Sequence, residues 1–427
     1  MSFDAPPARH QRIAIIGGGI SGLAAALLLA PRHRVTLFEA EPRLGGHART
    51  VLAGLRGEQP VDTGFIVFNY ANYPHLTRLF ADLDVPVERS NMSFGASLDG
   101  GRVEYALRSF DALFGQRRNL ASPGFLAMVR GILRFNARAE AAAEQGDPTV
   151  DELIAGLGLG ERFRNHYLLP ICGAIWSSPA EEVGAFPARS LLRFMRNHAL
   201  LAPRAQHQWW TVRGGSVEYV RRLASRLGLL GVDLRPGCPV QAVSRGPAGV
   251  TVRPHGGLAE TFDEVVLACH ADQALALLSD ATPEERGALG AVAYRPNRVV
   301  LHRDAGQMPQ RRRCWSAWVY RSESASDTVG VTYWMNRLQN IPETDPLFVT
   351  LNPGRAIPDE TVYDEVSFDH PVFDRAALAA QDRIERANGT NRTWFAGAWL
   401  RWGFHEDGFA SAMRIVRRME RMERVAA

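Results

Sequence analysis

The sequence predicts an α/β protein, α+β overall, whose N-terminal segment forms a strand-loop-helix unit. An apolar run at residues 12–16 leads into the loop GGGISG at residues 17–22, and a helix-forming run of Ala and Leu follows. A second apolar run at residues 34–38 ends at Glu39. Together these features predict a Rossmann-like nucleotide-binding domain. At about 150 residues per domain, the 427 residues leave room for a second domain.

The glycine-rich loop has the spacing of a dinucleotide site. Gly17 permits a tight turn, Gly19 lets the backbone approach a pyrophosphate, and Gly22 lets the helix pack closely on the strand. The helix N-terminus then presents free N–H groups to the phosphates. Glu39 lies 17 residues after Gly22, close to the offset of a ribose-binding carboxylate. The strands and the acid around the loop distinguish it from a chance glycine-rich turn.

The basic residues are all arginine, because the sequence contains 49 arginines and no lysine. Schiff-base chemistry and the P-loop of NTPases both need a lysine, so both are excluded. The arginines are scattered along the chain, and the net charge is only +4. A nucleic-acid partner is therefore not expected, whereas weak attraction to anionic lipid is compatible with the charge.

Cysteine spacing and the N-terminal residues indicate the compartment. The four cysteines lie far apart and show no zinc-ligand spacing, so we expect reduced thiols and no metal site. The polar N-terminal residues differ from a signal peptide. We therefore expect a cytoplasmic protein, with peripheral contact at the inner face of the membrane as an option. The sequence leaves the oligomeric state open.

Glycine-rich motifs continue beyond Glu39 and return near the C-terminus. A second glycine pair lies in RLGGHART at residues 43–50, and VDTGF follows at 61–65. WFAGAW stands at 394–399 and HEDGFASA at 405–412. In these motifs the chain resembles the FAD-dependent amine oxidase and phytoene-desaturase-like flavoproteins. It also looks like a bacterial subgroup of predicted NAD/FAD-binding oxidoreductases related to fatty-acyl desaturases and isomerases.

The resemblance implies a GR2-type domain that binds FAD. It places Gly17, Gly19 and Ser21 at the diphosphate and Glu39 at the adenosine ribose. It places Thr63, Gly64 and Phe65 at the isoalloxazine. The remaining cofactor contacts that it implies are Val240 at the adenine, Gly397 with Asp407 at the ribityl-phosphate end, and also Gly22, Arg43, Gly46, His47 and Phe409.

One of these residues departs from the family pattern. His47 stands where the family often has a phosphate-binding arginine, and a neutral histidine donates a weaker hydrogen bond. Arg43 or Arg49 could compensate.

The resemblance also implies the domain organisation. Residues 1–75, 210–280 and 390–427 are expected to form the FAD-binding domain. Residues 76–209 and 281–389 are expected to form an inserted mixed α+β substrate domain.

Two patterns within these segments each allow two interpretations. Residues 125–138 predict an amphipathic helix, with arginines on one face and Phe125, Met128, Val129, Ile132 and Leu133 on the other. That helix either docks on a membrane or packs on its own domain. Trp394, Trp399 and Trp402 either wall a substrate tunnel or fill the core.

The resemblance favours hydride transfer from a substrate C–H bond to flavin N5, most directly in a fatty-acyl chain of a lipid that is desaturated or isomerised. His405 and Glu406 are the candidate acid/base residues, unless they only cap the helix or bind the ribityl chain. An amine oxidase is the first alternative, although such enzymes commonly keep a lysine near flavin N5. A non-catalytic or redox-sensing flavoprotein is the second.

Overall fold

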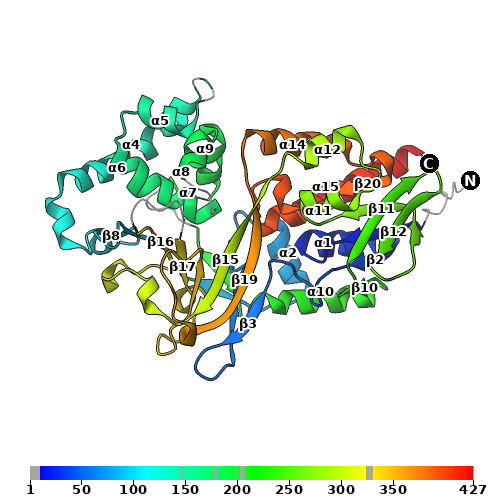
Figure 1. Cartoon of the computed structure of the whole chain (residues 1–427), viewed down its shortest axis with the longest axis horizontal. Helices are drawn as coiled ribbons and strands as arrows, with labels where there is room; N and C mark the ends of the chain where they lie inside the picture. Colours follow the sequence, from blue (N-terminus) through cyan, green and yellow to red (C-terminus); the bar gives the residue numbers. More distant parts are fainter. Residues whose placement is uncertain are drawn as a thin grey trace, which may run out of the picture.

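Five parallel strands form the sheet of the nucleotide-binding domain (Figure 1). The computed structural model describes residues 10–144, 146, 148–176, 180–198, 200–201, 207–323 and 330–426. The strands of the sheet come from distant parts of the chain, in the order β10 (Asp233–Arg235), β2 (Arg34–Phe38), β1 (Arg12–Ile16), β14 (Glu264–Leu267) and β20 (Thr393–Phe395).

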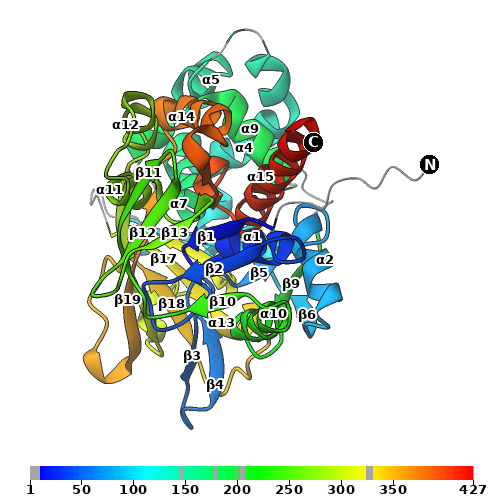
Figure 2. The same cartoon turned by 90° about the vertical axis from the view of Figure 1, so that its right-hand side faces the viewer.

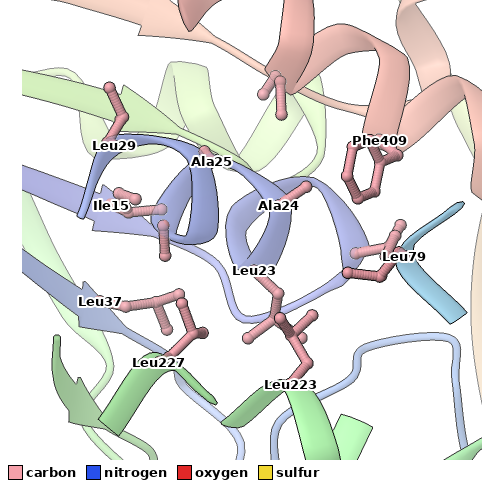
Figure 3. Close-up of a cluster of buried hydrophobic side chains, with 14 of the residues drawn as sticks. Ile15, Leu23, Ala24, Ala25, Leu29, Leu37, Leu79, Leu223, Leu227 and Phe409 are labelled. Atoms are coloured by element: carbon pink, nitrogen blue, oxygen red, sulfur yellow. The ribbon is translucent and has the colours of Figure 1, made fainter. Parts of the chain in front are cut away.

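Alternate residues of β1 face two different cores, as the period of a strand requires. Ile13 and Ile15 pack in a first core with four helices: α1 (Ile20–Leu29), α2 (Pro74–Asp82), α10 (Val217–Leu229) and α15 (His405–Ala426). Figure 3 shows Ile15 and Leu37 of the sheet beside Leu223 and Leu227 of α10.

The other face of the sheet carries a second core, which contains Ala14 and Ile16. Helices and a three-stranded sheet cover it (Figure 2). They are α11 (Ala271–Leu277), α12 (Pro283–Leu289), α14 (Arg375–Ala387), β11 (Val240–Gly246), β12 (Gly249–Pro254) and β13 (Glu260–Phe262). Cover on both faces explains the apolar strand sequences.

A seven-stranded sheet forms the centre of the second domain. Its order is β19 (Val362–Pro371), β15 (Tyr294–His302), β18 (Phe348–Leu351), β17 (Gly330–Trp334), β16 (Trp318–Arg321), β7 (Phe94–Leu98) and β8 (Val103–Ala106). All neighbours are antiparallel except β16 and β7. The long strands β15 and β19 run between the two domains (Figure 1).

A helical subdomain lies beside this sheet. It contains α3 (Phe110–Leu113), α4 (Pro123–Ala143), α5 (Val150–Gly156), α6 (Glu161–Phe163), α7 (Leu169–Trp176), α8 (Ala180–Ala185) and α9 (Ala188–Asn197). Two small sheets lie between the domains, formed by β3 (Thr50–Ala53) with β4 (Gln59–Asp62), and by β5 (Val67–Phe68), β9 (Trp209–Val212) and β6 (Val87–Ser90).

Core packing adds detail to the expected domain boundaries, which stay a prediction. Leu76, Leu79 and Phe80 of α2 lie in the first core of the nucleotide-binding domain. Helices α12 and α14 lie in its second core. These three helices therefore pack with the nucleotide-binding sheet, although the expected boundaries assigned them to the substrate segments.

Helix α4 packs on its own domain, and its buried face differs from the expected one. Phe125 and Met128 are buried, but so are Gly131 and Phe135. Leu133, which the sequence pattern placed with the apolar residues opposite the arginines, is 60% exposed and does not pack with them. The reason is that Phe163 packs against Gly131, which turns this side of the helix toward the core.

No helix in the described ranges is both long and apolar enough to cross a membrane. The uncharged stretch at residues 13–30 is a strand, a turn and a short helix. All four cysteines are free thiols. The described residues contain no cluster of three or more side chains suited to a metal ion.

Candidate functional site

The first glycine loop lies at the carboxyl ends of β1 and β14. Gly17 has φ +112°, and its N–H donates to the carbonyl of Phe38 at 2.8 Å. A Cβ on Gly17 would lie 2.5 Å from the carbonyl oxygen of Ala268, and one on Gly22 would lie 1.8 Å from that of Gly17. Both positions therefore require glycine, as the loop pattern predicted.

Two helix N-termini meet at this loop. A Cβ on Gly408 of α15 would lie 2.8 Å from the side chains of Ile20 and Ser21 of α1. The N–H groups of Ile20, Ser21 and Gly22 donate to no residue that the structure describes. Uncapped N–H groups and two positive dipole ends make this a place for an anion.

The second glycine pair lies against the first loop. Gly45 donates to the carbonyl of Gly18 at 2.8 Å, and a Cβ on Gly46 would lie 3.1 Å from the Cα of Gly19. Gly19 and Gly46 both keep part of their surface accessible. The two loops thus expose backbone without side chains, and a diphosphate could approach this backbone closely.

Glu39 directly follows β2 and lies beside the first glycine loop. One carboxylate oxygen accepts from the N–H of Gly18 at 2.5 Å, and the other accepts from that of Glu41 at 2.8 Å. A carboxylate has about four acceptor positions, so capacity remains for two ribose hydroxyls. Val240 begins β11 close by, since Cys238 donates to the carbonyl of Glu39 at 2.8 Å. The expected adenine and ribose contacts are therefore neighbours.

Residues 63–65 lie against the second glycine loop. Together with the two glycine loops they form what we call the accessible strip. Phe65 donates to the carbonyl of His47 at 2.8 Å, and a Cβ on Gly64 would lie 2.0 Å from that same oxygen. The N–H of Thr63 donates to the carbonyl of Arg49 at 2.9 Å. Gly64, Phe65 and His47 are partly accessible, whereas Thr63 is buried.

His47 belongs to a group of three histidines. Its ring lies 4.6 Å from that of Phe368, 5.8 Å from His370 and 5.9 Å from His270. Burial lowers the pKa of His47 well below its usual value, and the neighbouring histidines lower it further. The ring nitrogens of His47 and His370 bond to no described residue. His47 is therefore an uncharged group beside the strip.

The two nearby arginines both bond to groups of the protein itself, and the expected FAD contact of Arg43 stays a prediction. The Arg43 guanidinium donates to the carbonyls of Gly46 at 2.9 Å and Ala48 at 3.3 Å. Arg49 pairs with both carboxylate oxygens of Asp364 on β19, at 2.6 and 3.0 Å. Arg43 thus braces the second glycine loop, and Arg49 joins the two domains.

The C-terminal motif at residues 394–412 lies against the start of α1, where Gly408 faces Ile20 and Ser21. Gly397 donates to the Ser411 hydroxyl at 2.9 Å, and that hydroxyl donates to the carbonyl of Gly408 at 2.6 Å. The Asp407 carboxylate accepts from the N–H groups of Trp402 and Phe404 at 3.2 and 3.1 Å. Burial raises the pKa of Asp407 to about 6. Asp407 therefore orders the turn that leads into α15.

Phe409 is buried in the first core (Figure 3). It points from α15 toward Leu79 of α2, and its ring stacks on that of His75 at 5.9 Å. This position gives Phe409 a packing role, and a cofactor contact for it stays a prediction.

His405 is enclosed between two aromatic rings. Phe65 stacks on it at 4.0 Å with an interplanar angle of 10°, and its Nε2 lies 2.7 Å from the Tyr219 hydroxyl. Burial lowers the pKa of His405 to about 3, so the imidazole is neutral at neutral pH. Sequence reasoning missed Tyr219, because its place in an amphipathic helix looks like that of any core aromatic.

Glu406 caps helix α2. Its two carboxylate oxygens accept from the N–H groups of His75 and Leu76, each at 2.9 Å. Burial raises the pKa of this carboxyl group. Both oxygens are thus engaged with a helix N-terminus, and this geometry favours the capping alternative over the acid/base role, which remains a prediction.

Asp62 is a second residue whose importance the sequence did not show. Its buried carboxylate accepts from the N–H and hydroxyl of Ser216, the hydroxyl of Thr50 at 2.6 Å and the amide of Gln339 at 2.9 Å. It therefore joins three chain segments beneath residues 63–65. The DTG motif had marked the position but not this role.

The tryptophans near the C-terminus mainly fill the core. Trp394 and Trp399 are buried, and their indole N–H groups donate to Glu264 and to the carbonyl of Cys269. Trp402 is partly accessible and lies near Phe194. Of the three, only Trp402 keeps part of its side chain accessible, and a tunnel wall at Trp402 stays a prediction.

Comparison with known proteins identifies the family. The family model described as flavin containing amine oxidoreductase matches residues 20–401. The chain belongs to this family. The expected family, cofactor and fold are thereby confirmed. The uncapped helix N-termini, the bare glycine backbone and the Glu39 carboxylate fit FAD's diphosphate and ribose.

A curated relative is similar in sequence to part of the chain. The chain is 26% identical over 294 residues to a hydroxyneurosporene desaturase of Rubrivivax gelatinosus, covering 61% of this chain and 54% of that protein. The chain thus spans about half the length of this curated relative.

Solved structures share the fold at low identity. A fatty acid isomerase from P. acnes matches with TM-score 0.67 and 16% identity, over 96% of this chain and 98% of that one. Cyclohexylamine oxidase from Brevibacterium oxydans matches with TM-score 0.68 and 18% identity, over 96% and 100%.

Proposed function

We propose that this flavoenzyme desaturates a fatty-acyl chain of a lipid, or isomerises a double bond in it. The observation that carries the proposal is that, among the described residues, no carboxylate close to Phe65 is free of internal hydrogen-bond donors. Asp62, Glu406 and Asp407 all have their carboxylates engaged by internal donors. Beside them lie Phe65 and the neutral His405. Such surroundings suit a hydrocarbon better than an ammonium group.

Desaturation removes a hydride from one carbon and a proton from its neighbour, so that a C=C bond forms and the substrate loses two electrons. Bound FAD supplies the two-electron acceptor. Oxygen or a redox partner then takes up the electrons. In isomerisation the hydride returns to a different carbon, and no net oxidation occurs.

This chain's own residues hold and screen the reacting centre. Phe65 covers the His405 ring, and the Tyr219 hydroxyl fixes its orientation through Nε2. The low pKa makes His405 a neutral hydrogen-bonding group and a weak base. As a predicted proton acceptor it would have to act on a proton made acidic by hydride loss from the adjacent carbon.

Two relatives support a hydrocarbon substrate by their names, a desaturase and a fatty acid isomerase. An amine oxidase is the second candidate, because the family model and a structural neighbour carry that activity in their names. The absence of lysine from the chain weighs against it. A lipid substrate also brings the enzyme to a membrane surface, so peripheral contact belongs to the proposal.

The test is anaerobic mixing of the purified yellow protein with candidate substrates. We expect loss of flavin absorbance with acyl lipids and none with amines. Because an isomerase shows no lasting bleaching, the lipid products are also analysed by mass spectrometry. Bleaching by amines would overturn the proposal, and unchanged lipids without bleaching would favour a redox-sensing role.

A further inference from the structure

An excess of positive over negative charge is concentrated in one segment. Residues 102–138 contain seven arginines and two acidic residues, a formal net charge of +5. The whole chain carries only +4, so the remaining residues sum to −1. The arginines looked scattered in sequence, but this segment, the basic lobe, is where the charge is concentrated.

The fold places the basic lobe at one end of the molecule. It contains β8, α3, a short 3-10 turn at Arg117–Ala121 and most of α4. In Figure 1 this segment, coloured cyan, forms the left-hand end, far from the nucleotide-binding sheet. The charge is therefore separated from the FAD site along the long axis of the molecule.

The arginines of the lobe are exposed and largely unpaired. All seven side chains are exposed: Arg102, Arg108, Arg117, Arg118, Arg130, Arg134 and Arg138. Arg117 pairs with Asp111. In the described parts of the chain the other six form no ion pair with an acid. Arg108 also donates to the carbonyl of Arg313, so an eighth exposed arginine borders the lobe.

Large apolar side chains stand exposed among these arginines. Phe110 is 73% exposed, Leu133 60% and Leu120 48%. Phe110 begins α3, which is capped by the Ser109 hydroxyl at 3.1 Å. A single exposed apolar residue is ordinary, but three in the same segment as six unpaired arginines give the lobe both charged and apolar exposed groups.

We infer that the basic lobe docks on an anionic membrane surface. Guanidinium groups bind lipid phosphates in bidentate fashion, and exposed aromatic and aliphatic side chains enter the region between head groups and acyl chains. The inference deepens the proposed lipid activity by naming a contact surface. It can be tested separately, because vesicle binding requires no turnover.

The experiment is co-sedimentation of the FAD-loaded protein with vesicles of phosphatidylcholine, with and without phosphatidylglycerol. We expect binding only to the anionic vesicles, weakened by salt. The variant Arg130→Gln/Arg134→Gln/Arg138→Gln should bind about 100-fold more weakly, from about fivefold for each arginine near an anionic surface. The matched control removes three exposed arginines of the nucleotide-binding domain, Arg34→Gln/Arg226→Gln/Arg253→Gln, and should change binding little.

A second pair of variants tests the apolar part. Phe110→Ser should reduce the binding that persists at high salt, whereas Leu258→Ser, at a residue 90% exposed on the other domain, should not. An unchanged flavin spectrum verifies the fold of each variant.

Several results would overturn the inference. One is a wild-type protein that does not bind anionic vesicles at low salt. This result is expected if the lobe binds an acidic protein or a nucleic acid instead. Another is an equal loss of vesicle binding in both triple variants, because it would mean that total charge, and not the position of the arginines in the lobe, determines binding. Binding to vesicles without conversion of acyl lipids would support the docking surface and count against the proposed function.

Discussion

His47 occupies a position where related flavoproteins often carry an arginine, and its neighbours keep it neutral. Its ring lies against Phe368 and near His270 and His370. Residue 47 therefore supplies no side-chain cation, and binding of the FAD diphosphate rests more on backbone N–H groups and helix dipoles. Such binding depends less on salt than binding to a side-chain cation does.

We therefore predict that His47→Arg tightens FAD binding and makes it sensitive to salt. A charge-assisted hydrogen bond is worth about 1.5–3 kcal/mol, against about 1 for a neutral one. Titration of the apoprotein with FAD at low and high salt measures the effect. The neutral variant His47→Gln is the control. Equal salt dependence in His47→Arg and the wild type would contradict a diphosphate contact at residue 47.

The hydrogen bond between Tyr219 and His405 is the second residue-scale feature. Tyr219→Phe leaves Nε2 of His405 buried without its partner, at a cost of about 1–3 kcal/mol in the free energy of unfolding. Denaturant unfolding of the FAD-loaded protein measures this loss. Tyr363→Phe is the matched control, because no described residue bonds the buried Tyr363 hydroxyl, and it should be neutral or stabilising. A neutral Tyr219→Phe would show that the His405 ring is satisfied elsewhere.

At the scale of elements, Glu406 connects α15 to α2 through the two N–H groups that it caps. We predict that Glu406→Ala destabilises the fold by about 1–3 kcal/mol and that Glu406→Gln, which keeps one acceptor, costs less. Turnover of Glu406→Gln should fall less than about tenfold. Asp374→Ala, which uncaps α14 instead, is the control for a cap on another helix. A stable Glu406→Gln protein with turnover lost would identify Glu406 as the catalytic acid or base.

Sequence patterns predicted these elements where a local rule decides the structure. The loop at Gly17, Gly19 and Gly22 was predictable because a Cβ at Gly17 or Gly22 would collide with backbone. The exposure of Leu133 was not predictable from the sequence, because it depends on Phe163, which packs against α4 from a distant position in the chain. Likewise, no sequence signal shows that Tyr219 meets His405 across 186 residues.

For the whole molecule, the buried histidines predict a pH dependence of stability. Burial lowers the pKa of His405 to about 3 and those of His302 and His370 to about 4, below the usual 6.5. The folded protein thus binds these protons more weakly than the unfolded chain does. The stability is complete above pH 6.5 and is lost as the pH falls toward 4, by up to about 1.4 kcal/mol per pH unit for each histidine.

Buried carboxyl groups act in the opposite direction. Burial raises the pKa of Asp62 and that of Asp407 to about 6, so each favours the folded state at low pH and loses that effect as the pH rises through 6. Glu264 and Glu406 also have raised pKa values, which makes four such carboxyl groups. Nine histidines have lowered pKa values and outnumber them, so we expect net loss of stability on acidification. Denaturant unfolding from pH 7 to 4 tests this, and His405→Asn should flatten the curve. A stability that rises over this range would contradict the balance.

The order of strands in the nucleotide-binding sheet bears on how the protein is made. Its central strands come from residues 12–38, but β20 and α15 lie within residues 393–426. On the ribosome, the first glycine loop emerges long before the helix N-terminus that packs against it. A cofactor site that includes this helix N-terminus can therefore form only after residues 393–426 have been synthesised. Until then β14 is the edge strand of the nascent sheet, with unpaired backbone groups on its outer side.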